Sequence, residues 1–365
     1  MKRSPAEIDL RHRMGLVLSN RLNRDLVQAH PLTQLFWECT LRCNLRCRHC
    51  GSDCKVSAEF KDMPFEDFGR VLDRIAAKTD PHKVFVIITG GEPLLRRDLE
   101  QCGLSIYKKG FPWGMVTNGF LLSEERYESL LKSGLHSMTI SLDGLEDDHD
   151  WMRGVKGSFA KASEAIKMVA GSGKIAFDVV SCVNRRNLDH LDEIKNFLVE
   201  AGVKEWRLFT VFPVGRAAQD HDLQLDSDQF KALMQFIVNC RKEFKARVPG
   251  AIKAAYGCEG FLGNFEGEVR DHFFSCQAGI TVGSVLCDGS ISACASIRAD
   301  YHQGNIYKDD FMEVWENRFQ PYRDHDWMRT DDCAKCKYWK FCQGNGMHLR
   351  DENGKLILCH LKRLQ

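Results

Sequence analysis

The cysteines are the feature that most limits what this chain can fold into. The chain has sixteen of them, unevenly placed: five lie between Cys39 and Cys54, seven between Cys258 and Cys342, and one more at Cys359. Disulfides are disfavoured in the reducing cytoplasm, so cysteine groups there indicate metal or redox chemistry. Three others stand alone in the long middle stretch, and we interpret them as small buried hydrophobic residues: Cys102, Cys182 and Cys240.

The rest of the composition predicts a cytoplasmic protein with a sizeable core. Hydrophobic residues make up 44% of the 365 residues and charged residues 28%, which is ordinary for a globular chain. The N-terminal segment is charged and lacks the apolar run and cleavage site of a signal peptide. No stretch of about 18 apolar residues is present, so we expect no membrane insertion. A formal net charge of +1 gives no sign of a nucleic-acid partner.

Short apolar runs alternate with amphipathic stretches between residues 35 and 212. The runs predict strands at 35–39, 84–89, 114–117, 137–142, 176–183 and 206–212. The stretches between them predict helices, among them 124–133, 159–170 and 188–201. This alternation is typical of parallel βαβ units, and six such units predict an α/β fold with a partial (β/α)6, TIM-like barrel.

The pattern changes after Pro213. Residues 227–247 predict one long helix, and turn-rich segments with a hairpin at Asp288-Gly289 follow it. We therefore predict three parts, with the second boundary in the window 225–250. They are an N-terminal helical extension at 1–34, a core at 35–230, and a small cysteine-rich domain with its linker helix at 231–365.

Cys43, Cys47 and Cys50 stand in one short loop directly after the first predicted strand. Three thiolates at this spacing can bind three irons of a [4Fe–4S] cluster and leave the fourth iron open to an exogenous ligand. The alternative is a zinc loop with extra ligands from Cys39 and Cys54, although zinc sites usually pair two Cys-x-x-Cys units or use Cys/His pairs.

This Cys-x3-Cys-x2-Cys spacing resembles the signature of the radical S-adenosylmethionine (SAM) superfamily, and the resemblance extends from about Phe36 onward. It implies that the open iron chelates SAM. Reductive cleavage of SAM then yields a 5′-deoxyadenosyl radical that abstracts hydrogen from a substrate. It also implies a reducing electron donor of the flavodoxin or ferredoxin type. The family position of His49 packs near the adenine.

A second motif follows the second predicted strand and consists of Gly90, Gly91, Glu92 and Pro93. Glycine at a strand end lets the backbone approach a ligand closely. The four residues resemble the family's GGEP motif, whose backbone and glutamate hold the amino group of SAM.

Further candidates lie after later strands, where a barrel places its functional residues: Asn118, Ser141, Asp143, Arg153, Ser181, Val183 and Asn184. The resemblance implies that Arg153 pairs with the SAM carboxylate, which an arginine fork suits. The alternative for Arg153 is an ordinary surface cation. Ser141 and Asp143 are implied contacts of the ribose. The three candidates from the fifth strand onward are implied to line the adenine side.

The cysteines after residue 258 resemble the SPASM extension of radical SAM enzymes, which holds up to two auxiliary [4Fe–4S] clusters. The resemblance assigns one complete ligand set: Cys333, Cys336, Cys342 and Cys359. Cys276 and Cys294 belong to the other cluster, with a third ligand from Cys258 or, less favourably, Cys287. A structural zinc site stays open as the alternative for the complete set, since four thiolates also suit zinc.

Two positions depart from the SPASM pattern. Gly346 stands where the family usually has another cysteine, so the first auxiliary cluster has an open iron, uses a substitute such as His348, or is absent. Gly346 could equally serve the backbone as a turn residue with positive φ. Ala295 stands where sulfatase-maturing members carry an aspartate that can act as base. This argues against formylglycine formation and leaves the general base unassigned.

SPASM relatives mostly modify peptides and proteins, so we expect a radical SAM oxidoreductase that matures a peptide or protein. The first alternative is a radical SAM oxidoreductase that acts on a small molecule or a tetrapyrrole. The alternative from another class is a non-catalytic metal-binding or electron-transfer protein. The GGEP motif and Arg153 disfavour that last alternative, because pure electron transfer needs no SAM site.

Overall fold

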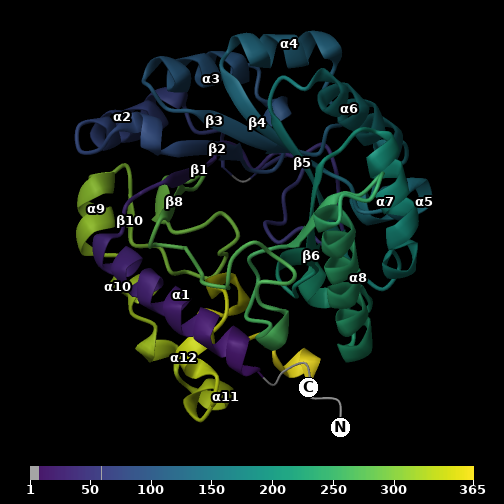
Figure 1. Ribbon diagram of the computed structural model, residues 1–365. Coiled ribbons are helices and arrows are strands. Elements are labelled where there is room, and N and C mark those ends of the chain that lie inside the picture. Colours follow the sequence, from purple (N-terminus) through teal and green to yellow (C-terminus); the bar gives the residue numbers. More distant parts are fainter. Residues whose placement is uncertain (1–7, 59) are drawn as a thin grey trace.

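A computed structural model describes residues 8–58 and 60–365 (Figure 1). The first seven residues of the predicted N-terminal extension lie outside these ranges. The strands are β1 (Gln34–Glu38), β2 (Phe85–Thr89), β3 (Trp113–Thr117), β4 (Leu135–Ser141), β5 (Ala176–Val183), β6 (Glu205–Thr210), β7 (Lys253–Tyr256), β8 (Val282–Val285), β9 (Ser290–Ser292) and β10 (Gly304–Asn305). Within the described ranges these strands form one sheet in the order β10-β9-β8-β1-β2-β3-β4-β5-β6-β7.

Strands β1 to β6 form the parallel centre of this sheet, and neighbours in sequence are neighbours in space. The helices that connect them lie on the outside of the curved sheet (Figure 1). They are α2 (Phe65–Ala76), α3 (Leu99–Lys108), α4 (Glu124–Lys132), α5 (Glu146–Arg153), α6 (Ser158–Ser172) and α7 (Leu191–Glu200). The predicted partial (β/α)6 barrel is confirmed, and each of its six predicted strands overlaps the observed one.

Helix α2 shows how the sequence pattern produces this packing. Its buried side chains include Phe68, Leu72 and Ile75, which recur at the three- and four-residue spacing of one helix face. Phe68 stacks on the buried ring of Trp37 in β1, with ring centroids 4.5 Å apart. The apolar face of α2 therefore holds the helix against the strand that leads into the cysteine loop.

The strands after residue 230 extend the barrel sheet at both of its edges. β7 adds to β6 in parallel, and β8 adds to β1 in parallel. β8 and β9 form the hairpin predicted at Asp288-Gly289, and β10 pairs with β9. The predicted long helix is α8 (Ser227–Lys245), which begins with a capping box between Asp226 and Gln229. Because β7 and β8 pair with the two edge strands of the barrel, fewer backbone N–H and C=O groups of those strands lack a hydrogen-bond partner.

The cysteine-rich end of the chain contains four short helices, and helix α1 (Leu10–Ala29) lies across them (Figure 1). The short helices are α9 (Phe311–Asn317), α10 (Gln320–Arg323), α11 (Asp331–Ala334) and α12 (Trp339–Cys342). Leu16 of α1 is buried in a small apolar cluster with Phe261, Tyr338 and Phe341. The predicted N-terminal extension thus helps to bury the region around the last cysteines. No helix of the described ranges combines the length and the apolar character that a bilayer crossing requires.

Candidate active site and metal centres

Cys43, Cys47 and Cys50 lie together in the loop that follows β1, in a cluster that also holds Cys54. Two backbone hydrogen bonds dock this loop on the end of α5. The Arg46 amide donates to the Arg153 carbonyl at 3.0 Å, and the Arg48 amide donates to the Met152 carbonyl at 2.8 Å. A local loop therefore gathers the three thiols, and a distant helix fixes its position.

The electrostatics of the loop differ from one thiol to the next. Burial raises the pKa of Cys43 to about 12 and also raises the pKa of Cys47. A hydrogen bond from the Cys54 thiol lowers the pKa of Cys50, although burial opposes that shift. Cys39 is fully buried in the main core, outside this cluster. The structure therefore brings one of the two alternative zinc ligands, Cys54, into the loop and excludes the other.

The GGEP segment lies directly against the backbone that precedes the cysteine loop. The Gly91 amide donates to the Thr40 carbonyl at 2.8 Å. A Cβ on Gly90 would lie 2.2 Å from the Thr40 carbonyl oxygen, and one on Gly91 would lie 2.2 Å from that of Arg42. Glycine is required here because two backbone segments touch.

Glu92 joins the ends of β2 and β3. Its buried carboxylate accepts hydrogen bonds from the Leu94 amide at 3.0 Å, the Thr117 hydroxyl at 2.7 Å and the Asn118 amide at 2.8 Å. Burial raises the pKa of Glu92 against these donors. Pro93, also buried, starts the short turn that follows. Most of the acceptor capacity of this carboxylate is therefore used within the protein.

The Asn118 side chain reaches the cysteine loop directly. Its amide donates to Asn44 Oδ1 at 2.9 Å. The buried Asn44 Nδ2 and His49 Nδ1 have no hydrogen-bond partner in the described ranges. Buried polar atoms without partners are costly, so they mark a place where a bound group fits. Three clustered thiols with unpaired polar atoms beside them therefore suit an iron–sulfur cluster with a polar ligand.

Arg153 and Asp143 form a buried ion pair beside the loop. Arg153 Nε lies 2.8 Å from Asp143 Oδ2, and Arg153 Nη1 lies 3.7 Å from Cys47 Sγ. His49 Nε2 lies 3.6 Å from the same carboxylate oxygen, and burial lowers the pKa of His49 to about 4. Burial opposes ionisation of Asp143, but Arg153 and the nearby histidines hold the pKa of Asp143 below its usual value. This arrangement excludes the surface-cation alternative for Arg153.

The interpretation of Cys182 as an isolated core residue was wrong. The ligand atoms of His49, Asp143 and Cys182 all lie within 4.8 Å of one another. The Cys182 amide donates to Asp143 Oδ1 at 2.8 Å. Successive side chains of a strand point to opposite faces, so Cys182 faces the site because its two neighbours face the core.

The two neighbours of Cys182 are the predicted candidates Ser181 and Val183, and both are fully buried. The Ser181 hydroxyl donates to the Leu142 carbonyl and accepts from Trp206 Nε1. Val183 belongs to the main core. Ser141 is half-buried at the end of β4, and the buried Asn184 binds backbone groups near the end of β5. The side chains of Ser181 and Val183 are therefore engaged in the core, so these two residues can offer a ligand only their backbone atoms.

The four cysteines of the complete predicted set surround one cavity of about 210 Å³: Cys333, Cys336, Cys342 and Cys359. Arg350 Nη2 donates to Cys333 Sγ at 3.5 Å, and the Cys342 thiol donates to Asn345 Oδ1 at 3.5 Å. The thiols come from α11, α12 and the C-terminal turns, so chain folding closes the set around a common space.

Cys258, Cys276 and Cys294 form the second group. Burial raises the pKa of each thiol, and each is raised further by another member of the group: Cys258 by Cys294, Cys276 by Cys258, and Cys294 by Cys276. Cys258 has exposed surface, and its pKa is raised to about 11. Cys287 lies elsewhere, with its thiol donating to the Lys61 carbonyl at 3.5 Å.

Two family profiles match the chain in these regions. The radical SAM superfamily matches residues 37–198, and the SPASM iron–sulfur cluster-binding domain matches residues 276–337. The chain is a radical SAM enzyme with a SPASM domain. It therefore uses [4Fe–4S] clusters and SAM, and the non-catalytic alternative is wrong.

Several proteins resemble this radical SAM enzyme over most of its length. The AdoMet-dependent heme synthase of Nitratidesulfovibrio vulgaris is 25% identical over 352 residues, covering 90% of this chain and 94% of the relative. Mycofactocin maturase MftC of Mycolicibacterium smegmatis is 29% identical over 322 residues, covering 86% and 77%. The structure of native anSMEcpe with bound AdoMet shares the fold, with a TM-score of 0.71 at 19% identity and coverage of 91% and 94%.

The radical SAM site also contains Arg216, which the motifs did not indicate. Its amide donates to the Cys50 carbonyl at 3.1 Å, and its guanidinium donates to the carbonyls of Cys47 at 2.7 Å and Cys54 at 2.9 Å. A Cβ on the preceding Gly215 would lie 2.5 Å from the Cys50 carbonyl oxygen. Gly215-Arg216 follows the end of β6, so its position at a strand end was the available signal.

Proposed function

We propose that this radical SAM enzyme modifies a peptide or a protein. The observation that carries the proposal is the state of four buried or half-buried arginines near the cysteines; Arg46 and Arg48 beside the first cluster are exposed. Each of the four is paired with a carboxylate: Arg153 with Asp143 at 2.8 Å, Arg216 with Asp53 at 2.9 Å, Arg298 with Glu38 at 2.8 Å, and Arg270 with Glu266 at 3.8 Å. A tetrapyrrole carries several carboxylates and needs cations that are free to bind them. A peptide backbone needs none.

Sequence similarity supports the same proposal. The relative with 29% identity is named as a mycofactocin maturase, and a relative with 22% identity is named as the PqqA peptide cyclase of Rhizobium meliloti. The second candidate is a tetrapyrrole oxidoreductase. The relative named as a heme synthase favours it, because the match covers 94% of that relative's length. The two candidates differ in the charge of the substrate, so they can be separated directly.

We assign Cys43, Cys47 and Cys50 as ligands of the cluster that binds SAM. When bound, this cluster supplies electrons that cleave SAM to a 5′-deoxyadenosyl radical for hydrogen abstraction. The backbone of Gly90 to Pro93 and the side chain of Asn118 hold this side of the site. Arg153 offers Nη2 to the SAM carboxylate, since that atom makes no hydrogen bond within the described ranges. Asp143 fixes the arginine, and Ser141 lies at the adjoining strand end.

We assign Cys333, Cys336, Cys342 and Cys359 to one auxiliary [4Fe–4S] cluster. A zinc ion bound by four sulfurs at about 2.3 Å leaves little free space between them. A cavity of about 210 Å³ instead suits a larger inorganic core. Cys258, Cys276 and Cys294 are assigned to a second auxiliary cluster. With these assignments the proposed domains are 1–34, the radical SAM core at 35–230 and the auxiliary-cluster domain at 231–365.

The electron donor is proposed to be an acidic flavodoxin or ferredoxin. A groove of about 1250 Å³ lies over the cysteine loop, and its cations are Arg46, Arg48, Lys55 and Arg216. Its acidic side chains are Asp53 and Asp220. An excess of positive charge beside the first cluster favours the approach of an acidic reductant.

The test is a competition between two substrate classes. Reconstituted, reduced enzyme with SAM is incubated either with the small-protein fraction of the source cells or with an iron coproporphyrin. We expect the protein fraction to raise 5′-deoxyadenosine release about tenfold or more above the uncoupled rate, on the logic that bound substrate aligns the reacting atoms. Mass spectrometry should find a modified peptide. Stimulation by the tetrapyrrole alone would overturn the proposal.

A further inference from the structure

We propose that His348 supplies the fourth protein ligand of the auxiliary cluster assigned to Cys258, Cys276 and Cys294. The inference rests on that assignment and extends it to a residue outside the cysteine pattern. It concerns the position where SPASM sequences usually have another cysteine and this chain has Gly346.

The backbone angles of Gly346 do not require glycine. Its φ is −67°, which any residue can adopt, while Gly344 and Asn345 carry the positive φ angles of this turn. The turn interpretation of Gly346 was therefore wrong. A side chain at this position would meet the ring of His348 and the backbone of Glu259. A Cβ on Gly346 would lie 2.6 Å from His348 Cε1, 2.7 Å from the Glu259 carbonyl oxygen and 2.9 Å from His348 Nδ1.

The imidazole thus occupies the space that a cysteine at position 346 would need. A cysteine side chain at 346 and the imidazole of His348 cannot occupy the same volume, so the histidine at 348 requires a glycine at 346. One of the ring nitrogens lies near the place from which the family's thiolate would start. Histidine is an established iron–sulfur ligand type, since two imidazoles replace two thiolates on one iron of Rieske centres.

The segment that carries His348 touches the cysteine group. The Gly346 amide donates to the carbonyl of Glu259, the residue after Cys258, at 3.2 Å. The Met347 amide is close enough to the Cys276 thiol to lower its pKa against the effect of burial. The two residues that precede His348 therefore lie beside Cys276 and beside the residue that follows Cys258.

His348 has its ligating atoms free. Its side chain is half-buried, and it makes no hydrogen bond or ion pair with the described residues. Its ring contact is Phe212, with centroids 4.9 Å apart. His325 in the same region uses both ring nitrogens on backbone carbonyls, at 3.0 and 2.8 Å. Both ring nitrogens of His348 are therefore available to a bound group.

The test uses the auxiliary clusters alone. A variant with Cys43, Cys47 and Cys50 changed to Ala removes the first cluster. Reduced samples with natural or 15N-labelled histidine are compared by pulsed electron paramagnetic resonance. We expect a nitrogen coupling that changes with the isotope. The nitrogen coupling should be lost in His348→Ala. About one iron per chain should be lost with it, because one iron of the cluster no longer has a protein ligand.

Two further variants complete the design. His302→Ala removes another half-buried histidine and should leave the coupling and the iron content unchanged. The variant His348→Cys offers a thiolate in place of the imidazole, so it should keep the iron without the nitrogen coupling. Uncoupled SAM cleavage with the first cluster intact shows that the variants fold.

The proposal is overturned if no isotope-dependent coupling appears, or if His348→Ala keeps both the coupling and its iron. A role of His348 in substrate contact alone would give the first result, with the iron content of His348→Ala unchanged. Cys276→Ala distinguishes a failure of the underlying assignment. It should lose about four irons, and no loss would mean that the cluster itself is missing and His348 has nothing to bind.

Discussion

The carboxylate of Glu259 and the imidazole of His360 lie 3.1 Å apart in the core, and each residue directly follows a cysteine of a different auxiliary set. Glu259 follows Cys258, and His360 follows Cys359. Both side chains are almost completely buried. Because burial lowers the pKa of His360, the contact is a hydrogen bond from a neutral imidazole to the carboxylate. It ties the two groups of cysteines together through residues that are not ligands.

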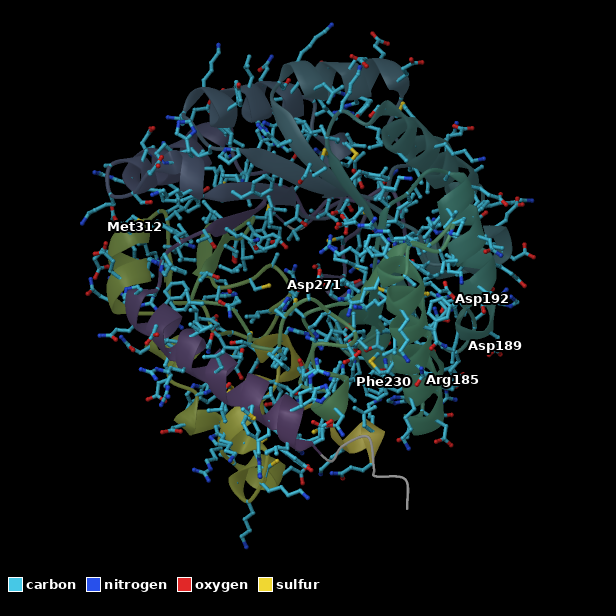
Figure 2. The ribbon with its side chains drawn as sticks, viewed as in Figure 1. Arg185, Asp189, Asp192, Phe230, Asp271 and Met312 are labelled. Carbon is cyan, nitrogen blue, oxygen red and sulfur yellow. The ribbon has the colours of Figure 1, made fainter. Side chains whose placement is uncertain are left out.

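The same pair is anchored to the barrel. The Glu259 carboxylate accepts from the amide of Thr210 at 2.8 Å and from its hydroxyl at 2.7 Å, at the end of β6. The Tyr256 hydroxyl of β7 also donates to it. The His360 ring packs against Phe230 of α8, labelled in Figure 2, with centroids 5.3 Å apart. Barrel strands and both cysteine groups thus meet in one buried polar network.

Glu259→Gln should lower stability and weaken both auxiliary sets. Burial opposes ionisation, but the donors around Glu259 hold its pKa below the usual value, so the native group is an anion. Weakening the hydrogen bonds to this buried carboxylate costs about 2 kcal/mol of the free energy of unfolding, measurable by urea denaturation, and the iron content should fall. Glu205→Gln is the control, because its pair with Lys253 at 3.2 Å is largely exposed. Equal effects of the two changes would argue against the network.

Cys258→Ala and Cys287→Ala should differ in metal content. The thiol of Cys258 lies with Cys276 and Cys294, while that of Cys287 binds the Lys61 carbonyl. We expect Cys258→Ala to lose about four irons per chain and Cys287→Ala to lose none. The measurement is an iron and zinc count after anaerobic reconstitution. If Cys287→Ala loses the iron and Cys258→Ala keeps it, the third ligand is Cys287 in the hairpin.

Gly154→Ala should disturb the cysteine loop more than Gly157→Ala. Both glycines have positive φ, at +70° and +81°, so both changes carry similar backbone strain. A Cβ on Gly154 would lie 2.6 Å from the Arg46 carbonyl oxygen, whereas one on Gly157 would meet nothing within 4 Å. The clash adds about 1–3 kcal/mol. Uncoupled 5′-deoxyadenosine release should fall in Gly154→Ala only. If both variants cleave SAM equally, docking on α5 does not matter.

His149 should make the protein less stable as the pH falls. Burial lowers its pKa to about 3, against about 6.5 in an unfolded chain. Below pH 6.5 the unfolded state therefore binds a proton that the folded state does not, so stability is lost as the pH falls toward 3. From pH 6.5 to 5 this amounts to about 2 kcal/mol.

The matched measurement compares unfolding free energies at pH 7 and pH 5. In His149→Asn a carbonyl can still accept the Asp143 amide that His149 Nδ1 accepts at 3.1 Å, without titrating. We expect a shallower pH dependence in this variant. His136→Asn, at an exposed histidine of β4, controls for the substitution itself. Parallel curves for the wild type and His149→Asn would contradict the prediction.

Local patterns were sufficient for the barrel and for the first set of thiols. The alternation of apolar runs and helical stretches predicted β1 to β6, because strand and helix periodicity depend on residues a few positions apart. Cys43, Cys47 and Cys50 are gathered by one loop, so their spacing alone predicted their proximity. The β8–β9 hairpin was predicted because the dipeptide Asp288-Gly289 is itself a local turn signal.

Contacts between distant segments decided the rest. Cys182 rather than Ser181 faces Asp143 because strand pairing sets which face of β5 looks into the site. Cys258 rather than Cys287 joins Cys276 because Cys276 precedes β8 and Cys287 follows it, so β8 carries Cys287 away to the Lys61 carbonyl. Spacing in the sequence cannot predict this placement. Arg216 reaches three carbonyls of a loop more than 160 residues away.

Gly346 shows the same division in a single residue. The sequence by itself determined that a cysteine was missing and that a histidine stood two positions later. The tertiary structure decided that the two belong to one place, since the ring of His348 fills the volume next to Gly346 and the segment docks on Glu259 and Cys276. The sequence determines the identity of each side chain, but packing between distant segments determines which side chains compete for the same volume.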